Sequence, residues 1–545
     1  METDRGTNRS TLDEISIRRQ AIAREIAALE EEDRTLAAAW NSYQPVERLL
    51  DEILVNVFEL CWDETPSGNG WTWTKLRYAC RRWNRVICQT AAFWTTVDAL
   101  NPCWLRLCLV RSEESLLDVV FTKRPPSIED VQELHPHASR IRSLRAVLSY
   151  TSEPWVCRIL PVLNNFCPAL ESLRLGRCLT RTEDVNAKLS NECHPTLKHL
   201  HIYGVRLAVD PPLFSGLRQL SIQNCSLSLS VDRLLDALSM ARHLHTLCIV
   251  ESLEATANSE SDVSCKETPV VLPQLIHLGV IGHSPHLTAS FLSRLRPSVH
   301  CAVKVDGPLR YSAGNIGAIT ASELLPPFPL REQVLPIIVS PLVTDITILA
   351  SESSCELRTD TYSPPGRPPA GKLILNVHDP GIIEEWPCLQ RAMADLVDVF
   401  RYAPLTRLSV TSTYGGLDDA DWDAVFVTFP TLVHLVLSGP ERTGAVWIAL
   451  KAGLGDMPSD VETVRCPRLE SITREEFEES HALFAEILDC VRKRSEAGSY
   501  LKSLNLITHD ADHAGDIKDL YMPEIAACVL DEVYFGEPTG SRSWY

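Results

Sequence analysis

One stretch in two halves decides the N-terminal fold: residues 45–61 read PVERLLDEILVNVFELC, and residues 75–97 read KLRYACRRWNRVICQTAAFWTTV. Apolar residues recur in both halves at intervals of three and four, the spacing that lines one face of an amphipathic helix. In the first half they are Leu49, Leu50, Ile53, Leu54, Val57 and Phe58, and in the second Leu76, Ala79, Cys80, Trp83, Val86 and Ile87. Two short helices cannot bury this much apolar surface in each other. We therefore expect a third body to cover the remainder, either the rest of the chain or a partner.

Residues 45–98 resemble an F-box of the fungal type. The resemblance rests on four motifs in order, which are PVERLLDEIL at 45–54, Val57-Phe58, ACRRW at 79–83 and Phe93-Trp94. F-box domains bind the Skp adaptor of cullin-RING (SCF) ubiquitin ligases. The resemblance thus implies an adaptor contact in or near Leu49, Ile53, Leu54, Val57, Phe58, Trp83 and Trp94. The family usually opens with Leu-Pro-Pro-Glu, whereas this chain has Gln-Pro-Val-Glu and keeps only the first proline.

Composition sets limits on the class of protein. The 545 residues exceed a single ordinary domain, and 45% of them are apolar, which allows a large core. A formal net charge of −19 disfavours nucleic acid and anionic membranes as main partners. The 18 cysteines include no Cys-x-x-Cys pair, and neither a secretory segment nor an apolar run of membrane-spanning length is present. We expect a protein of the cytoplasm or nucleus with reduced thiols, no metal site and no cofactor.

Residues 1–44 are expected to contain one leading helix. The first ten are polar and predicted to be disordered, and Thr11 with Glu14 has the spacing of a capping box. Apolar residues then repeat every seven positions, at Ile15, Ile22, Leu29 and Leu36, with Leu12 and Ile26 between them. The pattern fits either a short dimeric coiled coil or a helix packed on its own chain. Because Arg19 and Asp33 interrupt the second register, we favour packing on the chain.

Residues 99–138 are predicted to connect the F-box to the rest of the chain. The segment 101–111 has the composition of a helix. The segment 116–121, which contains Val119 and Val120, is typical of a short strand.

A repeated pattern, Leu-x-x-Leu-x-(Leu/Ile/Val), extends over residues 139–535. It begins at Leu170, Leu197, Leu217, Leu244, Leu275, Leu405, Leu432 and Leu501, with weaker copies at Val343 and Leu469. Neighbouring copies are mostly 20 to 31 residues apart, the range of leucine-rich repeats. No single repeat can cover its own leucines, so successive repeats must stack on one another. The pattern predicts a leucine-rich-repeat-like solenoid of parallel strands and return helices, and the fold class is therefore α/β.

The segments between the repeat strands divide into helices and loops. Amphipathic spacing predicts return helices at 231–238, 386–400 and 477–491. Serine- and proline-rich composition predicts loops at 251–269, 308–341 and 351–372, and a frayed tail at 536–545. Cys178 and Cys225 stand where such repeats often place Asn or Cys at the turn out of a strand. We expect both thiols to be structural.

No segment carries the signature of an enzyme. The sequence lacks a Gly-x-Ser-x-Gly elbow, a phosphate-binding loop, a His-Glu-x-x-His motif and a Gly-x-Gly-x-x-Gly motif. Its histidines have no convergent carboxylates or cysteines beside them in the sequence, so we interpret them as solvated polar residues. We therefore expect no catalytic site.

The outward positions of the repeat strands are the candidate target site. Residues between the inward leucines point out of the sheet, so stacked repeats would present a column of side chains. The basic members of this column and its histidines are Arg174, Lys198, His199, His201 and Arg218. In an acidic protein they favour an acidic or phosphorylated target segment, the alternative being ordinary solvated residues.

The resemblance and the repeats together indicate a substrate-recognition adaptor of an SCF-type ubiquitin ligase, with the F-box on the Skp adaptor and the repeats on an unknown protein target. The alternative is a ligase-independent repeat scaffold for protein–protein interaction, in which the F-box-like hairpin is only an N-terminal cap.

Overall fold

The structure is a computed structural model that describes much of the chain in two compact units. Unit 1 comprises residues 1–148 and 167–170, and unit 2 comprises 149–166 and 171–545. The residues described are 4–537 without 64–71, 100–101, 122–123, 148–155, 177–185, 226–230, 254–268, 309–319, 336–337, 339–342, 352–353, 361–370, 379–387, 414–415, 440–443, 453–463, 477–479 and 509–514.

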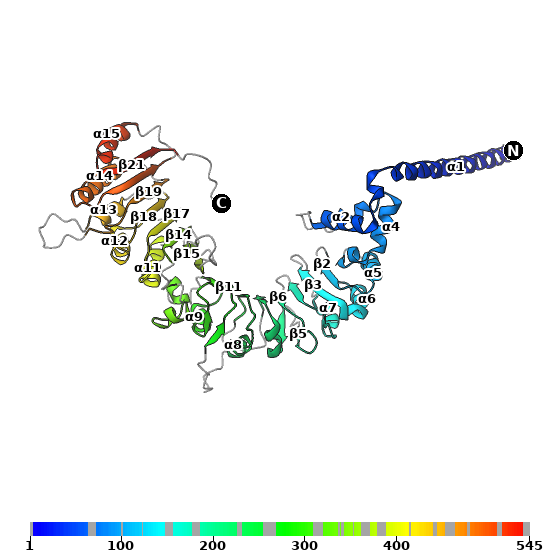
Figure 1. The fold of residues 1–545 in the computed structure, drawn as a ribbon, viewed down its shortest axis with the longest axis horizontal. Helices are drawn as coiled ribbons and strands as arrows, with labels where there is room; N and C mark the ends of the chain where they lie inside the picture. The colour runs from blue at the N-terminus through cyan, green and yellow to red at the C-terminus, as the bar shows by residue number, and fades with distance from the viewer. Residues whose placement is uncertain are drawn as a thin grey trace. The chain divides into compact units, whose positions relative to one another are not determined.

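Unit 1 is mainly helical and ends in three parallel strands (Figure 1). Its elements are α1 Asp4–Ser42, η1 Pro45–Arg48, α2 Asp51–Asp63, α3 Thr72–Leu76, α4 Arg81–Gln89, η2 Ala91–Trp94, β1 Thr96–Asp98, α5 Pro102–Arg111, β2 Leu117–Phe121, α6 Ile128–Leu134, η3 His135–Arg140 and β3 Ile141–Val147. The helix and strand predicted at 101–111 and 116–121 are confirmed as α5 and β2.

The second half of the F-box-like stretch is divided between two helices. We expected one helix through Leu76 to Ile87, but α3 ends at Leu76 and α4 begins at Arg81. Cys80 between them has an extended backbone, with φ −156°, and its sulfur accepts a hydrogen bond from the Trp83 amide at 3.4 Å. The thiol thus caps α4, which is why a new helix starts there.

The leading helix is longer than expected and does not pack as expected. α1 already begins at Asp4, so the prediction of disorder for residues 1–10 is wrong over 4–10; no proline interrupts this segment, and a helix once nucleated propagates at low cost. Its apolar side chains are exposed along its length, at Ile15 (55%), Ile22 (48%), Ile26 (52%), Leu29 (60%) and Leu36 (63%). The expectation that this face packs on its own chain is therefore wrong.

Unit 2 alternates strands with helices, and the helices lie along one side of its main sheet (Figure 1). Its elements are α7 Val156–Leu163, β4 Ser172–Gly176, β5 Asn186–Leu189, β6 His199–Tyr203, β7 Arg206–Val209, η4 Pro211–Gly216, β8 Gln219–Gln223, α8 Val231–Ser239, β9 Thr246–Val250, β10 Val270–Leu272, β11 His277–Ile281, α9 Pro285–Ser293, β12 Leu295–Pro297, β13 Ala302–Pro308, η5 Ala321–Leu324, α10 Leu330–Val334, β14 Asp345–Ala350, β15 Ser354–Asp360, β16 Leu373–His378, α11 Cys388–Phe400, β17 Arg407–Ser412, α12 Asp419–Thr428, β18 His434–Ser438, α13 Ala445–Lys451, β19 Ser471–Glu475, α14 His481–Glu496, β20 Leu501–Ile507, α15 Gly515–Ala526 and β21 Val529–Gly536.

The main sheet of unit 2 is mostly parallel and follows the chain order, with one exception. Strands β4, β6, β8, β9, β11 and β13 pair in parallel in that order, as do β17 to β21. Between these runs the order is β13, β16, β15, β14, β17, and β15 is antiparallel to both of its neighbours. The prediction of a loop at 351–372 is therefore wrong for β15, because pairing on both edges gives these residues the hydrogen bonds of a central strand.

The repeat leucines form the core of this sheet, as the pattern predicts. The first apolar residue of every copy is at most 2% exposed. The predicted helices at 231–238, 386–400 and 477–491 correspond to α8, α11 and α14. The predicted loop at 308–341 contains η5 and α10, while most of 251–269, most of the tail and Cys178 lie outside the described residues. Cys225 is buried, and its sulfur is 3.5 Å from the Ile202 carbonyl oxygen, as a structural thiol would be.

Candidate functional site

The F-box-like hairpin has a closed aromatic core. Leu54, Phe58 and Trp94 are at most 1% exposed. The Phe58 ring meets Trp83 edge to face with 4.9 Å between centroids, and Phe93 lies 6.3 Å away. Three of the residues that the resemblance assigns to the adaptor contact are therefore buried in the hairpin core. They support the exposed surface of the hairpin and do not form it.

Trp94 fixes the hairpin to the following helix. Its indole Nε1 donates a hydrogen bond of 2.8 Å to the Ile87 carbonyl oxygen at the end of α4. The Arg111 guanidinium of α5 lies over the ring at 4.4 Å, a cation–π arrangement. Trp94 thus supports the site without being exposed to a partner.

Of the other four predicted contact residues, Trp83 is half-buried against Phe58, whereas Leu49, Ile53 and Val57 are at the surface and belong to a larger exposed set. Leu49 is 36% exposed, Ile53 44% and Val57 40%, while Leu50 and Leu60 are more exposed still, at 69% and 65%. Leu50, Ile53, Val57 and Leu60 follow intervals of three and four, so they share one face of α2 and its approach. We call these five residues the α2 strip. Leu60 was missed because none of the four motifs that carry the resemblance includes it, although the helical spacing itself continues to that position.

A single arginine holds the start of the strip in place. Arg82 of α4 donates hydrogen bonds to the Glu47 carbonyl oxygen and to the Asp51 carboxylate, both at 2.6 Å, and also to the Leu49 carbonyl oxygen. It therefore ties η1 and the first turn of α2 to the second helix of the hairpin. Charge-assisted bonds of this kind are among the stronger ones in proteins. These bonds order the chain on either side of Val46 as it enters the helix.

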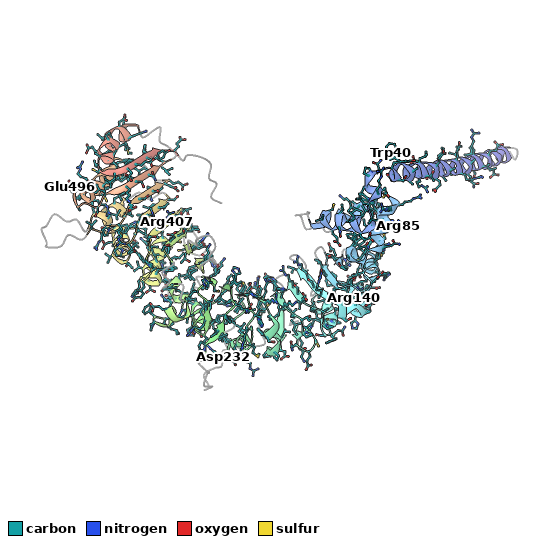
Figure 2. The ribbon with its side chains drawn as sticks, viewed as in Figure 1. Trp40, Arg85, Arg140, Asp232, Arg407 and Glu496 are labelled. Atoms are coloured by element: carbon teal, nitrogen blue, oxygen red, sulfur yellow. The ribbon has the colours of Figure 1, made fainter. Side chains whose placement is uncertain are left out.

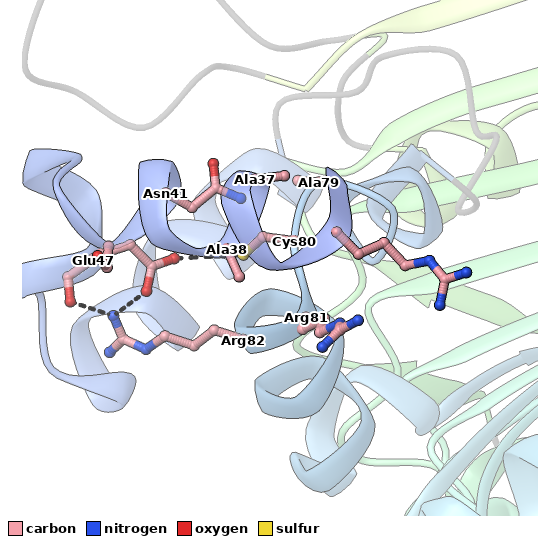
Figure 3. Close-up of a pocket in the computed structure, with 10 residues that line it drawn as sticks. Ala37, Ala38, Asn41, Glu47, Ala79, Cys80, Arg81 and Arg82 are labelled. Atoms are coloured by element: carbon pink, nitrogen blue, oxygen red, sulfur yellow. Dashed lines mark hydrogen bonds and ion pairs between the residues drawn. The ribbon is translucent and has the colours of Figure 1, made fainter. Parts of the chain in front are cut away.

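A pocket of about 350 Å³ lies between the end of α1 and this arginine (Figure 3). Its lining includes Ala37, Ala38 and Asn41 from α1 and residues 79–82 from the hairpin. The Cys80 thiol donates a hydrogen bond to the Glu47 carboxylate at 3.4 Å, and burial raises the pKa of this thiol. The pocket walls are therefore held by contacts within the protein.

The candidate target site lies on unit 2, and register brings part of it together. Arg174 of β4 pairs with His201 of β6, and the same column continues through β8, β9 and β11 to Lys304 of β13. Arg174 and Lys304 are exposed. Burial lowers the pKa of His201, and the nearby Arg174 charge lowers it further, so this imidazole is biased towards the neutral form. Lys304 was missed because β13 lacks the leucine pattern that identified the other strands.

The remaining predicted target residues lie outside this column. His199 is two residues before His201, in a neighbouring column with Gln219, and burial lowers its pKa as well. Lys198 and Arg218 precede their strands, and Lys198 forms an ion pair of 2.8 Å with Glu171. The cation of Lys198 is thus partly balanced within the chain, while Arg218 is exposed.

Comparison with known proteins identifies no relative, because no family model and no curated protein matches the sequence. Among the described residues, no three His, Cys, Asp or Glu side chains gather closely enough to hold a metal ion. No helix in the same part of the chain combines the length and the apolar character needed to cross a membrane.

Proposed function

We propose that this chain is a substrate-recognition adaptor of an SCF-type ubiquitin ligase whose α2 strip binds the Skp adaptor. The observation that carries the proposal is a row of exposed apolar side chains on a helix whose adjacent face is anchored in an aromatic core. Exposed rows of this kind are typical of helices that dock on a partner. The resemblance to the F-box names the partner. By holding a target protein, this chain would raise the concentration of that target near the subunits that carry out ubiquitin transfer.

We further propose that unit 2 is a leucine-rich-repeat-like solenoid that binds the target on its sheet. Support comes from successive parallel strands with buried repeat leucines and from the described helices, which lie along one side of the sheet (Figure 1). The other face of the sheet presents the outward-pointing side chains of the strands, which include Arg174 and Lys304. Five strand spacings separate them, which is about 24 Å. A target segment that meets both cations would be extended and acidic or phosphorylated.

Charge on the strip tests the adaptor contact. Replacing Ile53 and Val57 by glutamate should weaken binding of a purified Skp adaptor at least about tenfold, because two apolar contacts would become buried charges at an interface. The measurement is isothermal titration with purified full-length chain. Val110→Glu is the matched control, since Val110 is 70% exposed on α5, outside the strip, and it should bind like the parent.

Two outcomes would count against the adaptor function. One is equal affinity of the Ile53→Glu/Val57→Glu variant and the parent. The other is a parent chain that binds no Skp adaptor at micromolar concentration. If such a chain still captured protein targets, the ligase-independent scaffold would be the better interpretation.

A second charge reversal tests the target face. Changing Arg174 and Lys304 to glutamate should lower binding of acidic and phosphorylated peptides by about tenfold, since each cation–anion contact at such a surface contributes on the order of 1 kcal/mol. The probe is an array of acidic, phosphorylated and neutral peptides incubated with purified chain. Arg242→Glu/Arg492→Glu reverses two exposed charges away from this column and should leave binding unchanged. Equal loss in both double variants would instead indicate a non-specific effect of net charge.

A further inference from the structure

Helix α1 has apolar surface that its own chain leaves exposed. Its described side chains from Asp13 to Trp40 are all exposed, and they project from the helix along its length (Figure 2). Most of the stability of helices in proteins comes from packing an amphipathic face and not from intrinsic propensity. We therefore expect a helix from Asp4 to Ser42 that carries seven large exposed apolar residues to pack on a partner surface.

The exposed residues form one seam with a coiled-coil period. Ile15, Ile22, Leu29 and Leu36 repeat every seven residues, and each is followed four residues later by a second seam member. These second members are Arg19, Ile26, Asp33 and Trp40. The two charged residues have opposite signs and stand seven residues on either side of Ile26. The positions of these two charges indicate how a partner helix is oriented.

We propose that α1 pairs with α1 of a second copy of this chain in an antiparallel coiled coil. In a parallel pair each seam residue faces its own counterpart, so Arg19 would oppose Arg19 and Asp33 would oppose Asp33. Like charges in such positions destabilise a coiled coil. In an antiparallel pair centred between Ile26 and Leu29, Arg19 comes within three residues of Asp33 of the second copy, about 4.5 Å along the axis. The two like-charge layers of the parallel pair, Arg19 with Arg19 and Asp33 with Asp33, are thus replaced by two contacts between Arg19 and Asp33.

The charges beside the seam favour the same orientation. Glu30, Glu31, Glu32 and Asp33 form an acidic run in the second half of the helix. In the part of the chain that the structure describes, Arg34 is the one cation that pairs with this run, with Glu30 at 3.7 Å and with Glu31. A parallel pair would set two such runs side by side. The antiparallel pair places Arg24 level with Glu31 of the second copy and separates the centres of the two acidic runs by about 12 Å along the axis.

The mass of the full chain in solution is the first test. Multi-angle light scattering at micromolar concentration should give twice the chain mass of 60.8 kDa. Ile22→Glu/Leu29→Glu should return it to the monomer mass, because it places charge in the middle of the seam. Ile17→Glu is the matched control, since Ile17 is 64% exposed but outside the seam, and it should remain dimeric. A monomeric parent, as a helix reserved for a different protein would give, overturns the proposal, and so does a seam variant that stays dimeric.

Charge exchange tests the orientation. Arg19→Asp should raise the dimer dissociation constant, and adding Asp33→Arg should restore it, because the antiparallel contacts reform with reversed signs. In a parallel pair, Arg19→Asp would only replace one like-charge layer by another, and the second change would rescue nothing. The dissociation constants are measured by analytical ultracentrifugation of the full chain. Absence of rescue overturns the antiparallel arrangement.

Spin labels give a direct distance. A label introduced at Asp13 through a non-natural amino acid avoids the native cysteines. In the antiparallel pair the two labels are about 44 Å apart along the axis, whereas in a parallel pair they are level. Pulsed electron resonance should therefore show a long distance. A short one would establish the parallel pair and contradict the proposal.

Discussion

Replacing Phe58 by alanine is expected to destabilise unit 1 by about 3–5 kcal/mol, the usual cost of truncating a buried aromatic residue. Phe58 is 1% exposed, and its ring lies between Trp83 and Phe93. The truncation would leave a cavity that the short helices α2 and α4 cannot close without losing their other contacts. Hydrogen exchange of α2 and α4 amides in the full chain measures the effect on this unit alone.

The neighbouring residue provides the control for this prediction. Val57 precedes Phe58 on α2 but is 40% exposed, so Val57→Ala should change the stability of unit 1 by less than about 1 kcal/mol. Comparing the two variants distinguishes a residue of the hairpin core from a residue of the contact surface. If Phe58→Ala left amide protection intact and still abolished Skp-adaptor binding, Phe58 would be a direct contact and the aromatic core would be misassigned.

Acid is expected to destabilise unit 2 through a buried histidine. His283 is 3% exposed, and burial lowers its pKa from 6.5 to about 4. The unfolded chain therefore binds a proton at this site before the folded chain does, so the free energy of unfolding falls as the pH drops from about 6.5 towards 4. Between pH 7.5 and 5 this residue alone should remove about 2 kcal/mol. His194, which is fully buried and whose pKa burial also lowers, acts in the same direction.

Variants at two nearby positions isolate the contribution of His283. His283→Leu should reduce the loss of stability between pH 7.5 and 5 by about 2 kcal/mol, whatever its effect at neutral pH. His286→Leu changes an exposed imidazole three residues away and should keep the pH dependence of the parent. Chemical denaturation followed by hydrogen exchange of β9 and β11 gives the measurement. The same slope in parent and His283→Leu would show that His283 does not titrate as its burial implies.

Local sequence patterns determined much of the architecture. The α/β class with a helical N-terminal region and a long, mostly parallel sheet could be predicted, because the helical period at Leu49 to Phe58 and the repeat spacing from Leu170 onwards are local properties. The burial of the repeat leucines followed for the same reason. β13 and β15 escaped prediction, since neither carries the repeat pattern and the pairing of β15 depends on strands on both sides.

Tertiary structure alone decided which apolar residues form the core and which remain available to a partner. Periodicity places Phe58 and Val57 side by side, but only packing against α4 and η2 buries the first and exposes the second. Arg82 reaches Glu47 across 35 residues, and register aligns Arg174 with Lys304 from strands far apart in the chain. These contacts depend on distances between elements, which no local pattern encodes. Local patterns thus specified many of the helices and strands, and packing between these elements selected the candidate surfaces.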